Sequence, residues 1–140
     1  MTAPHAAIEM HKKSIQYAME GNKEGWLGMY AEDALVRDPV GPSPFDPEGK
    51  GHRGKVAIEK FWDTIIGPAK LTIVPTKRIP SGPNVCAVAM TATNQITPNK
   101  QTIVDMIVVY ELNAEGKLQT LSAHWDWNEM ERQLKELGFM

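Results

Sequence analysis

The first part of the chain carries apolar side chains at helical spacing. In residues 5–20 they recur at mixed steps of three and four, which predicts a helix, and Gly21 fits its end. A second helix is expected over roughly 23–31, with its aromatic and apolar side chains on one face. A third is expected over 55–66, where a Gly-Pro pair stops the pattern.

A two-residue alternation, typical of β-strands, replaces the helical spacing in the second half. Turn sequences short enough for antiparallel connections separate the runs. The four expected strands are Leu71–Ile79, Val85–Ile96, Thr102–Leu112 and Leu118–Trp127.

This order of elements predicts an α+β fold. A short strand is expected over Ala34–Asp38 and a final helical segment over Asn128–Leu137. We therefore expect a curved antiparallel sheet wrapped around three N-terminal helices, in a single domain over residues 1–140.

The alternation also assigns side chains to the two faces of the sheet. Leu121, Ala123 and Trp125 share an apolar face that should look toward the helices. The run over Thr102–Leu112 is nearly apolar on both faces, so its second face should also be covered, with another subunit as one candidate cover. One face carries Val104, Met106, Val108 and Tyr110, and the other carries Ile103, Asp105, Ile107 and Val109.

Composition and charge narrow the classes of function. The chain has 140 residues and a formal net charge of −2, which gives no electrostatic footprint for nucleic acid or an anionic membrane. No apolar run approaches the ~20 residues of a membrane span. The single cysteine, Cys86, cannot form an intramolecular disulfide. We expect a cytoplasmic protein with a small-molecule partner, no cofactor and no metal site.

The clearest candidate for chemistry is Asp38, which closes a short strand immediately before Pro39. The segment 39–54 that follows contains four Pro and four Gly, and a loop of that length often forms the rim of a binding site. A carboxylate at such a rim, between walls of low dielectric, would be suited to proton transfer. Alternatively, the Asp-Pro pair only begins a turn and caps nearby amides.

The stretch from Gly21 to Trp62 resembles the ketosteroid-isomerase branch of the nuclear-transport-factor-2-like (SnoaL-like) superfamily. A second stretch, from Glu115 to Trp125, resembles the last hairpin of that family. The matching pieces are Gly21-Asn-Lys-Glu, Met29-Tyr30-Ala-Glu-Asp-Ala, Arg37-Asp38-Pro39-Val40-Gly41, Gly54 with Ala57-Ile58 and Phe61-Trp62, Glu115-Gly116-Lys117-Leu118-Gln119, and Ala123-His124-Trp125.

The resemblance implies a cystatin-like cone with an internal apolar cavity of steroid size, and Asp38 as a general base. It also implies a homodimer formed through the outer face of the sheet. The implied ligand-binding residues are Tyr30, Phe61, Trp62, Met106, Val108, Leu121, Ala123 and Trp125.

The chain departs from the family at the oxyanion hole. The family's donor Tyr corresponds to Ser14, its protonated Asp to Val108 and its supporting Tyr to Trp62. Ser14 itself and Tyr17, three residues further along the helix, are the candidate replacements, and with Asp38 they form the predicted catalytic set.

Three functions remain open at this point. One is a steroid Δ-isomerase-like enzyme that transfers a proton within a 3-ketosteroid or related fused-ring ketone. The second is a non-catalytic binding protein for small apolar ligands such as steroids or polyketides. The third is another reaction of the superfamily, such as polyketide cyclisation or epoxide hydrolysis. The hydrolase would need a second carboxylate on the last strand, where Ala123 stands, which argues against it.

Overall fold

Four α-helices form in the computed structural model, which describes residues 4–140. They are α1 (Ala6–Glu20), α2 (Lys23–Gly28), α3 (Gly54–Phe61) and α4 (Trp127–Glu136), and α3 runs on into a π-helical turn, η1 (Trp62–Ile66). Side-chain caps define several of their starts: His5 Nδ1 accepts a hydrogen bond from the Ile8 amide and Asn22 Oδ1 accepts one from the Gly25 amide. Within residues 4–140, no helix is long and apolar enough to cross a membrane.

Six strands form one sheet in the order β2-β1-β6-β5-β4-β3. Every neighbouring pair is antiparallel except β1 and β6, which run parallel. The strands are β1 (Tyr30–Arg37), β2 (His52–Arg53), β3 (Leu71–Ser81), β4 (Val85–Thr97), β5 (Lys100–Leu112) and β6 (Leu118–His124).

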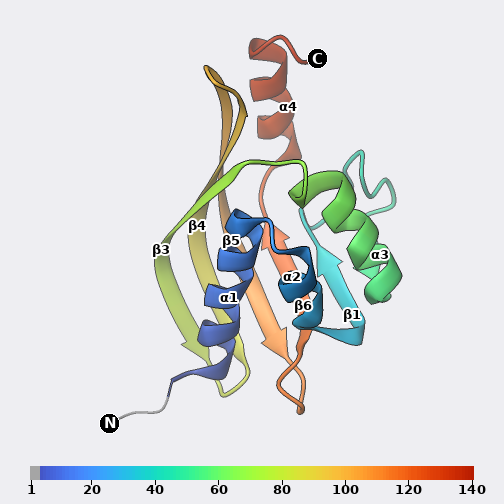
Figure 1. The fold of residues 1–140 in the computed structure, drawn as a ribbon, viewed down its shortest axis with the longest axis vertical. Coiled ribbons are helices and arrows are strands. Elements are labelled where there is room, and N and C mark those ends of the chain that lie inside the picture. The colour runs from blue at the N-terminus through green and yellow to red at the C-terminus, as the bar shows by residue number, and fades with distance from the viewer. Residues whose placement is uncertain (1–3) are drawn as a thin grey trace.

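The sheet curves around the N-terminal helices (Figure 1). Helix α1 packs on β3, β4 and β5, and α3 packs on β1. Burial follows the alternation: Val88, Met90, Val104 and Val108 are buried on the inner face, whereas Ile103 and Ile107 on the outer face are exposed. The predicted α+β fold with a curved sheet and N-terminal helices is confirmed, with one parallel strand pair that the sequence pattern did not indicate.

Of the boundaries that differ from the predicted ones, two lie next to the cavity-forming strands β1 and β6. The second helix ends at Gly28 and Tyr30 already begins β1, because pairing with β6 at Leu118 outweighs the helical spacing. At the other end, β6 stops at His124 instead of continuing to Trp127. Asp126 accepts a hydrogen bond from the Asn128 amide and thereby caps α4, which begins at the next residue, Trp127.

The proline- and glycine-rich segment after β1 is tied down at both ends. The Val40 amide donates to the Ala123 carbonyl at 2.9 Å, and the Asp46 carboxylate accepts from the Lys50 and Gly51 amides. Gly51 has a φ of 83°, and a Cβ there would come within 2.8 Å of side chains on β1. Glycine is therefore required where this segment returns to the sheet.

Helix α4 is docked on β5 beyond the end of β6, at the upper end of the molecule in Figure 1. The Ile103 amide donates to Gln133 Oε1 at 2.8 Å, and Gln133 Nε2 donates to the Ile103 carbonyl at 2.7 Å. One side-chain amide thus pairs the backbone groups that a neighbouring strand would otherwise pair. This docking turns Met130 and Leu134 toward the interior of the cone.

Candidate active site

A cavity of about 400 Å³ lies between the inner face of the sheet, α1, η1 and α4. Its volume falls within the range of small-molecule sites, and most of its lining is apolar. The loop after β1 contributes Phe45, whose ring meets that of Trp127 edge-on with centroids 5.7 Å apart. The polar residues of the lining, apart from the three tryptophans, are Ser14, Asp38, Thr64, Asn94, Thr102 and Tyr110.

Asp38 follows directly on β1 and faces this cavity. Trp125, which follows β6, donates from Nε1 to Asp38 Oδ1 at 2.5 Å. Burial raises the pKa of Asp38 from 3.8 to about 6, and the hydrogen bond from Trp125 limits the rise by stabilising the charged form. Part of the Asp38 surface remains accessible, since it lines the cavity. The result is a carboxylate that is ionised at neutral pH but far more basic than an ordinary aspartate.

Two hydroxyl groups line the same cavity as Asp38, on Ser14 of α1 and Tyr110 of β5, and the charge of Asp38 acts on that of Tyr110. Burial raises the pKa of Tyr110, so its hydroxyl keeps its proton, and a contact with the Ser14 hydroxyl acts in the opposite direction. The Tyr110 ring packs against the His11 ring of α1, with ring centroids 5.1 Å apart. The pair therefore offers hydrogen-bond donors at a fixed place in a largely apolar space.

The structure brings most of the expected ligand-binding residues to one cavity. Met106, Val108, Leu121, Ala123 and Trp125 all line it, together with Asp38 and Ser14. Tyr30, Phe61 and Trp62 do not: they are buried around Trp26, which is itself part of the lining. Their ring centroids lie 4.8, 6.4 and 5.1 Å from that of Trp26. These three residues form the layer that supports the cavity wall.

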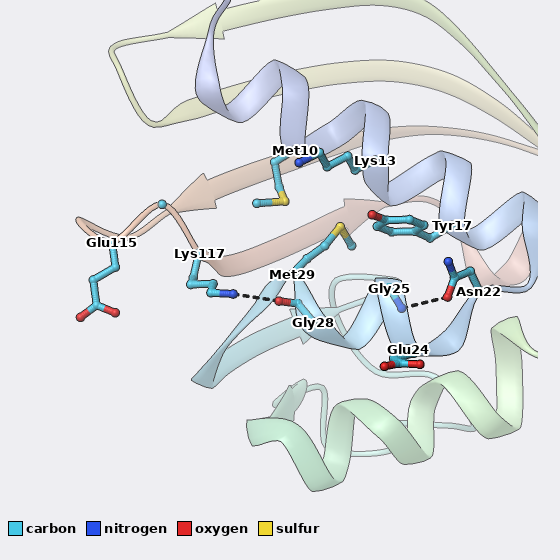
Figure 2. Close-up of a pocket in the computed structure, with 11 residues that line it drawn as sticks. Met10, Lys13, Tyr17, Asn22, Glu24, Gly25, Gly28, Met29, Glu115 and Lys117 are labelled. Carbon is cyan, nitrogen blue, oxygen red and sulfur yellow. Dashed lines mark hydrogen bonds between the residues drawn. The ribbon is translucent and has the colours of Figure 1, made fainter.

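Tyr17 lies elsewhere, in a groove of about 570 Å³ between α1, α2 and the β5–β6 turn. Figure 2 shows its ring above Asn22 and Gly25, among the residues that line this groove. The ring packs so closely there that a Cβ on Gly25 would come within 2.9 Å of Tyr17 Cε1. A three-residue step turns a side chain by about 60° around the helix axis, which is enough to move it from the cavity to the next element. The structure therefore does not bring Tyr17 together with Ser14 and Asp38.

Tyr110 is one of the polar cavity residues that the sequence did not mark as a site residue; Thr64, Asn94 and Thr102 are the others. Strand alternation places Tyr110 on the same face as Met106 and Val108, so the signal for its direction was present. Its position, however, is not one at which the resembling family carries a hydrogen-bond donor. The Tyr110 hydroxyl lies two residues beyond Val108 on the same strand face.

Other chemistries find little support in the described part of the chain. Among residues 4–140, no three His, Cys, Asp or Glu side chains gather as a metal ion would require. Cys86 is buried in β4 and burial raises the pKa of its thiol to about 11, so the nucleophilic thiolate is scarce at neutral pH.

Comparison with known proteins places this geometry in context. A model of the SnoaL-like domain matches residues 13–120. A steroid Δ-isomerase from Nocardioides simplex is 26% identical over 110 residues, which are 79% of this chain and 81% of that protein. The Δ5-3-ketosteroid isomerase from Mycobacterium sp. superposes with a TM-score of 0.84 at 28% identity, covering 90% of this chain and 97% of that one. A Mycobacterium tuberculosis protein in complex with estradiol-17β-hemisuccinate has a TM-score of 0.84 at 26% identity, covering 90% and 98%.

Proposed function

This chain belongs to the SnoaL-like domain family, and on that premise we propose that it is a steroid Δ-isomerase-type enzyme. Its substrate is a Δ5-3-ketosteroid or a related fused-ring ketone, and Asp38 is the general base. The observation that carries the proposal is a carboxylate of raised pKa facing a largely apolar cavity of about 400 Å³. Support also comes from the similarity to a Δ5-3-ketosteroid isomerase.

The proposed reaction moves one proton within the substrate. The Asp38 carboxylate removes a proton from the carbon between the ketone and the double bond, and the electron pair moves onto the ketone oxygen to give a dienolate. Asp38 then returns the proton to the far end of the conjugated system. The product is the conjugated enone, the substrate loses no atom, and the carboxylate is regenerated.

The raised pKa suits this task. An ordinary aspartate is too weak a base to take a proton from carbon efficiently, and a base is most effective when its pKa lies near the working pH. Largely apolar walls raise the pKa of Asp38 to about 6, while Trp125 keeps the charged form in one orientation. The surrounding walls also exclude water that would compete for the proton.

The proposal is tested by the ultraviolet absorbance of the conjugated enone. We expect the protein to convert a Δ5-3-ketosteroid, with kcat/KM half-maximal at about pH 6 and falling about tenfold per pH unit below that value. An acid limb near pH 4 would show that Asp38 titrates as an ordinary aspartate. Steroid binding without conversion at any pH would contradict the isomerase function and support a non-catalytic binding protein instead.

That alternative is a non-catalytic binding protein for small apolar ligands. Val108 favours it, because this residue stands where the resembling family carries a protonated aspartate and has no hydrogen-bond donor in its side chain. In such a protein Asp38 would orient a polar group of the ligand rather than move a proton.

We further propose that the chain forms a homodimer through the outer face of the sheet. Large apolar side chains on two strands are exposed there: Val74 and Ile79 on β3, and Ile103 and Ile107 on β5. Alanines of β4 lie between these two strands. A patch of this kind on an isolated chain marks an interaction surface.

Ile107→Lys places a charge at the centre of this face, on a residue that is 53% exposed in the single chain. We expect it to convert a dimer into a monomer, because a buried, unpaired ammonium group opposes association. Light scattering after gel filtration measures the mass. The matched control is Val56→Lys on α3, which is 85% exposed and does not belong to the outer face of the sheet, and it should leave the mass unchanged. A wild-type protein that is monomeric would refute the proposed dimer.

A further inference from the structure

We propose that the Tyr110 hydroxyl, supported by Ser14, is the hydrogen-bond donor for the ketone oxygen and for the dienolate that forms on it. The inference deepens the proposed isomerase function and rests on it. The resembling family carries a Tyr and a protonated Asp at the positions of Ser14 and Val108. In this chain a donor pair on β5 and α1 takes their place.

The strand register places Tyr110 at the correct end of the cavity. Arg37 of β1 pairs with Ser122 of the parallel strand β6, so the next residue, Asp38, comes level with Ala123. Ala123 pairs with Val108 of β5, and Asp38 is therefore level with Val108. Because each strand residue advances about 3.3 Å, Tyr110 is roughly 7 Å along the sheet from that level and Thr102 roughly 20 Å. The polar groups at Asn94 and Thr102, which are cross-strand neighbours, therefore lie at the far end.

The reaction requires the donor and the base to be close. The ketone oxygen is two bonds from the carbon that loses its proton, so its donor must lie within a few ångströms of the base. The charge of Asp38 acts on the Tyr110 hydroxyl, and Ser14 of α1 contacts that hydroxyl in the same cavity. Tyr17 lies in the outer groove instead.

Tyr110 is also held in place, as an oxyanion donor must be. Its side chain is only 2% exposed, and its ring packs against His11, which is fully buried on α1. The pKa of Tyr110 is raised by burial, so it donates a hydrogen bond and retains its proton throughout the reaction. Ser14 is placed to donate to the phenol oxygen in turn, which strengthens the bond that the phenol makes to the substrate.

A spectroscopic experiment separates this inference from the proposed function. The probe is a 4-ene-3-ketosteroid, the conjugated enone, which binds without further conversion and absorbs at longer wavelength when its carbonyl accepts a strong hydrogen bond. We expect the bound enone to show this red shift with the wild-type protein, and Tyr110→Phe to abolish most of it while lowering affinity about tenfold. Ser14→Ala should remove part of the shift.

Two comparisons complete the test. Tyr17→Phe makes the same chemical change on α1 outside the cavity and should keep the full red shift. Turnover of the Δ5-3-ketosteroid should fall about 10²-fold in Tyr110→Phe, the loss typical of one oxyanion donor.

A red shift retained in Tyr110→Phe overturns the role of Tyr110 and leaves the proposed isomerase function intact. A wild-type protein that binds the enone but converts no Δ5-3-ketosteroid overturns the isomerase, and the red shift then reports the ligand contact alone. Failure of the wild-type protein to bind the enone contradicts both.

Discussion

Asp38→Asn is expected to reduce isomerisation by about 10⁴-fold, the upper end of what a positioned general base contributes. An amide of the same shape cannot take a proton from carbon, and no other carboxylate or histidine lines the cavity in the described part of the chain. Affinity for the steroid should stay within about tenfold, a change of ~1.4 kcal/mol, because the largely apolar walls are untouched. The Asn oxygen can still accept the hydrogen bond from Trp125.

The measurement pairs enone formation with a direct titration of the steroid. Asp33→Asn is the matched control: it makes the same change on β1 at an exposed position, where the side chain accepts a hydrogen bond from Gln119 as an amide also can. Turnover in Asp38→Asn close to that of the wild type would remove Asp38 from the mechanism. A loss of affinity equal to the loss of turnover would show that Asp38 holds the ligand instead.

Much of the fold was predictable because periodicity reports burial. The alternation in Thr102–Leu112 correctly separated Met106 and Val108, which line the cavity, from Ile103 and Ile107, which are exposed. What the pattern could not report was pairing over long sequence distances. The parallel pairing of β1 with β6, which begins at Tyr30 with Leu118, extends β1 into residues whose local spacing is helical.

At the site, too, the positions of residues within one element could be predicted, whereas contacts between elements could not. Asp38 was found because a carboxylate beside a proline closes a strand at a rim. Trp125 was placed on the correct face, but its hydrogen bond to Asp38 depends on how the chain leaves β6 after His124. The direction of Tyr17 depends on the close fit of its ring against Gly25 of α2, a contact between two elements that no single-element pattern contains.

Asp38 also links function to stability. Its pKa in the folded protein, about 6, is above the ordinary value of 3.8, so the charged form is less favourable in the fold than in the unfolded chain. Above about pH 6 the carboxyl is ionised in both states and the full cost is present. As the pH falls from about 6 toward 3.8, the folded protein takes up its proton first and the cost disappears.

Buried His11 acts in the opposite direction. Burial lowers its pKa from 6.5 to about 4, and neither ring nitrogen has a hydrogen-bond partner within residues 4–140. Its contribution to stability is complete above pH 6.5 and is lost as the pH falls toward 4, because the unfolded chain then binds the proton first. In the wild-type protein the two groups partly offset each other between about pH 4 and 6.

Asp38→Asn is therefore expected to raise the free energy of unfolding at pH 8 by up to about 3 kcal/mol, which is the rise of the pKa from 3.8 to about 6 at 1.36 kcal/mol per unit. The gain should vanish near pH 4. Since His11 is unchanged, the variant should lose stability more steeply than the wild type as the pH falls from 6.5 to 4. Urea unfolding of both proteins at pH 8, 6 and 4.5 measures the difference. A variant that is less stable at pH 8, or a difference that does not depend on pH, would show that the fold does not disfavour the Asp38 charge. The expected result means that the largely apolar surroundings that make this carboxylate a strong enough base also destabilise the protein at the pH at which it works.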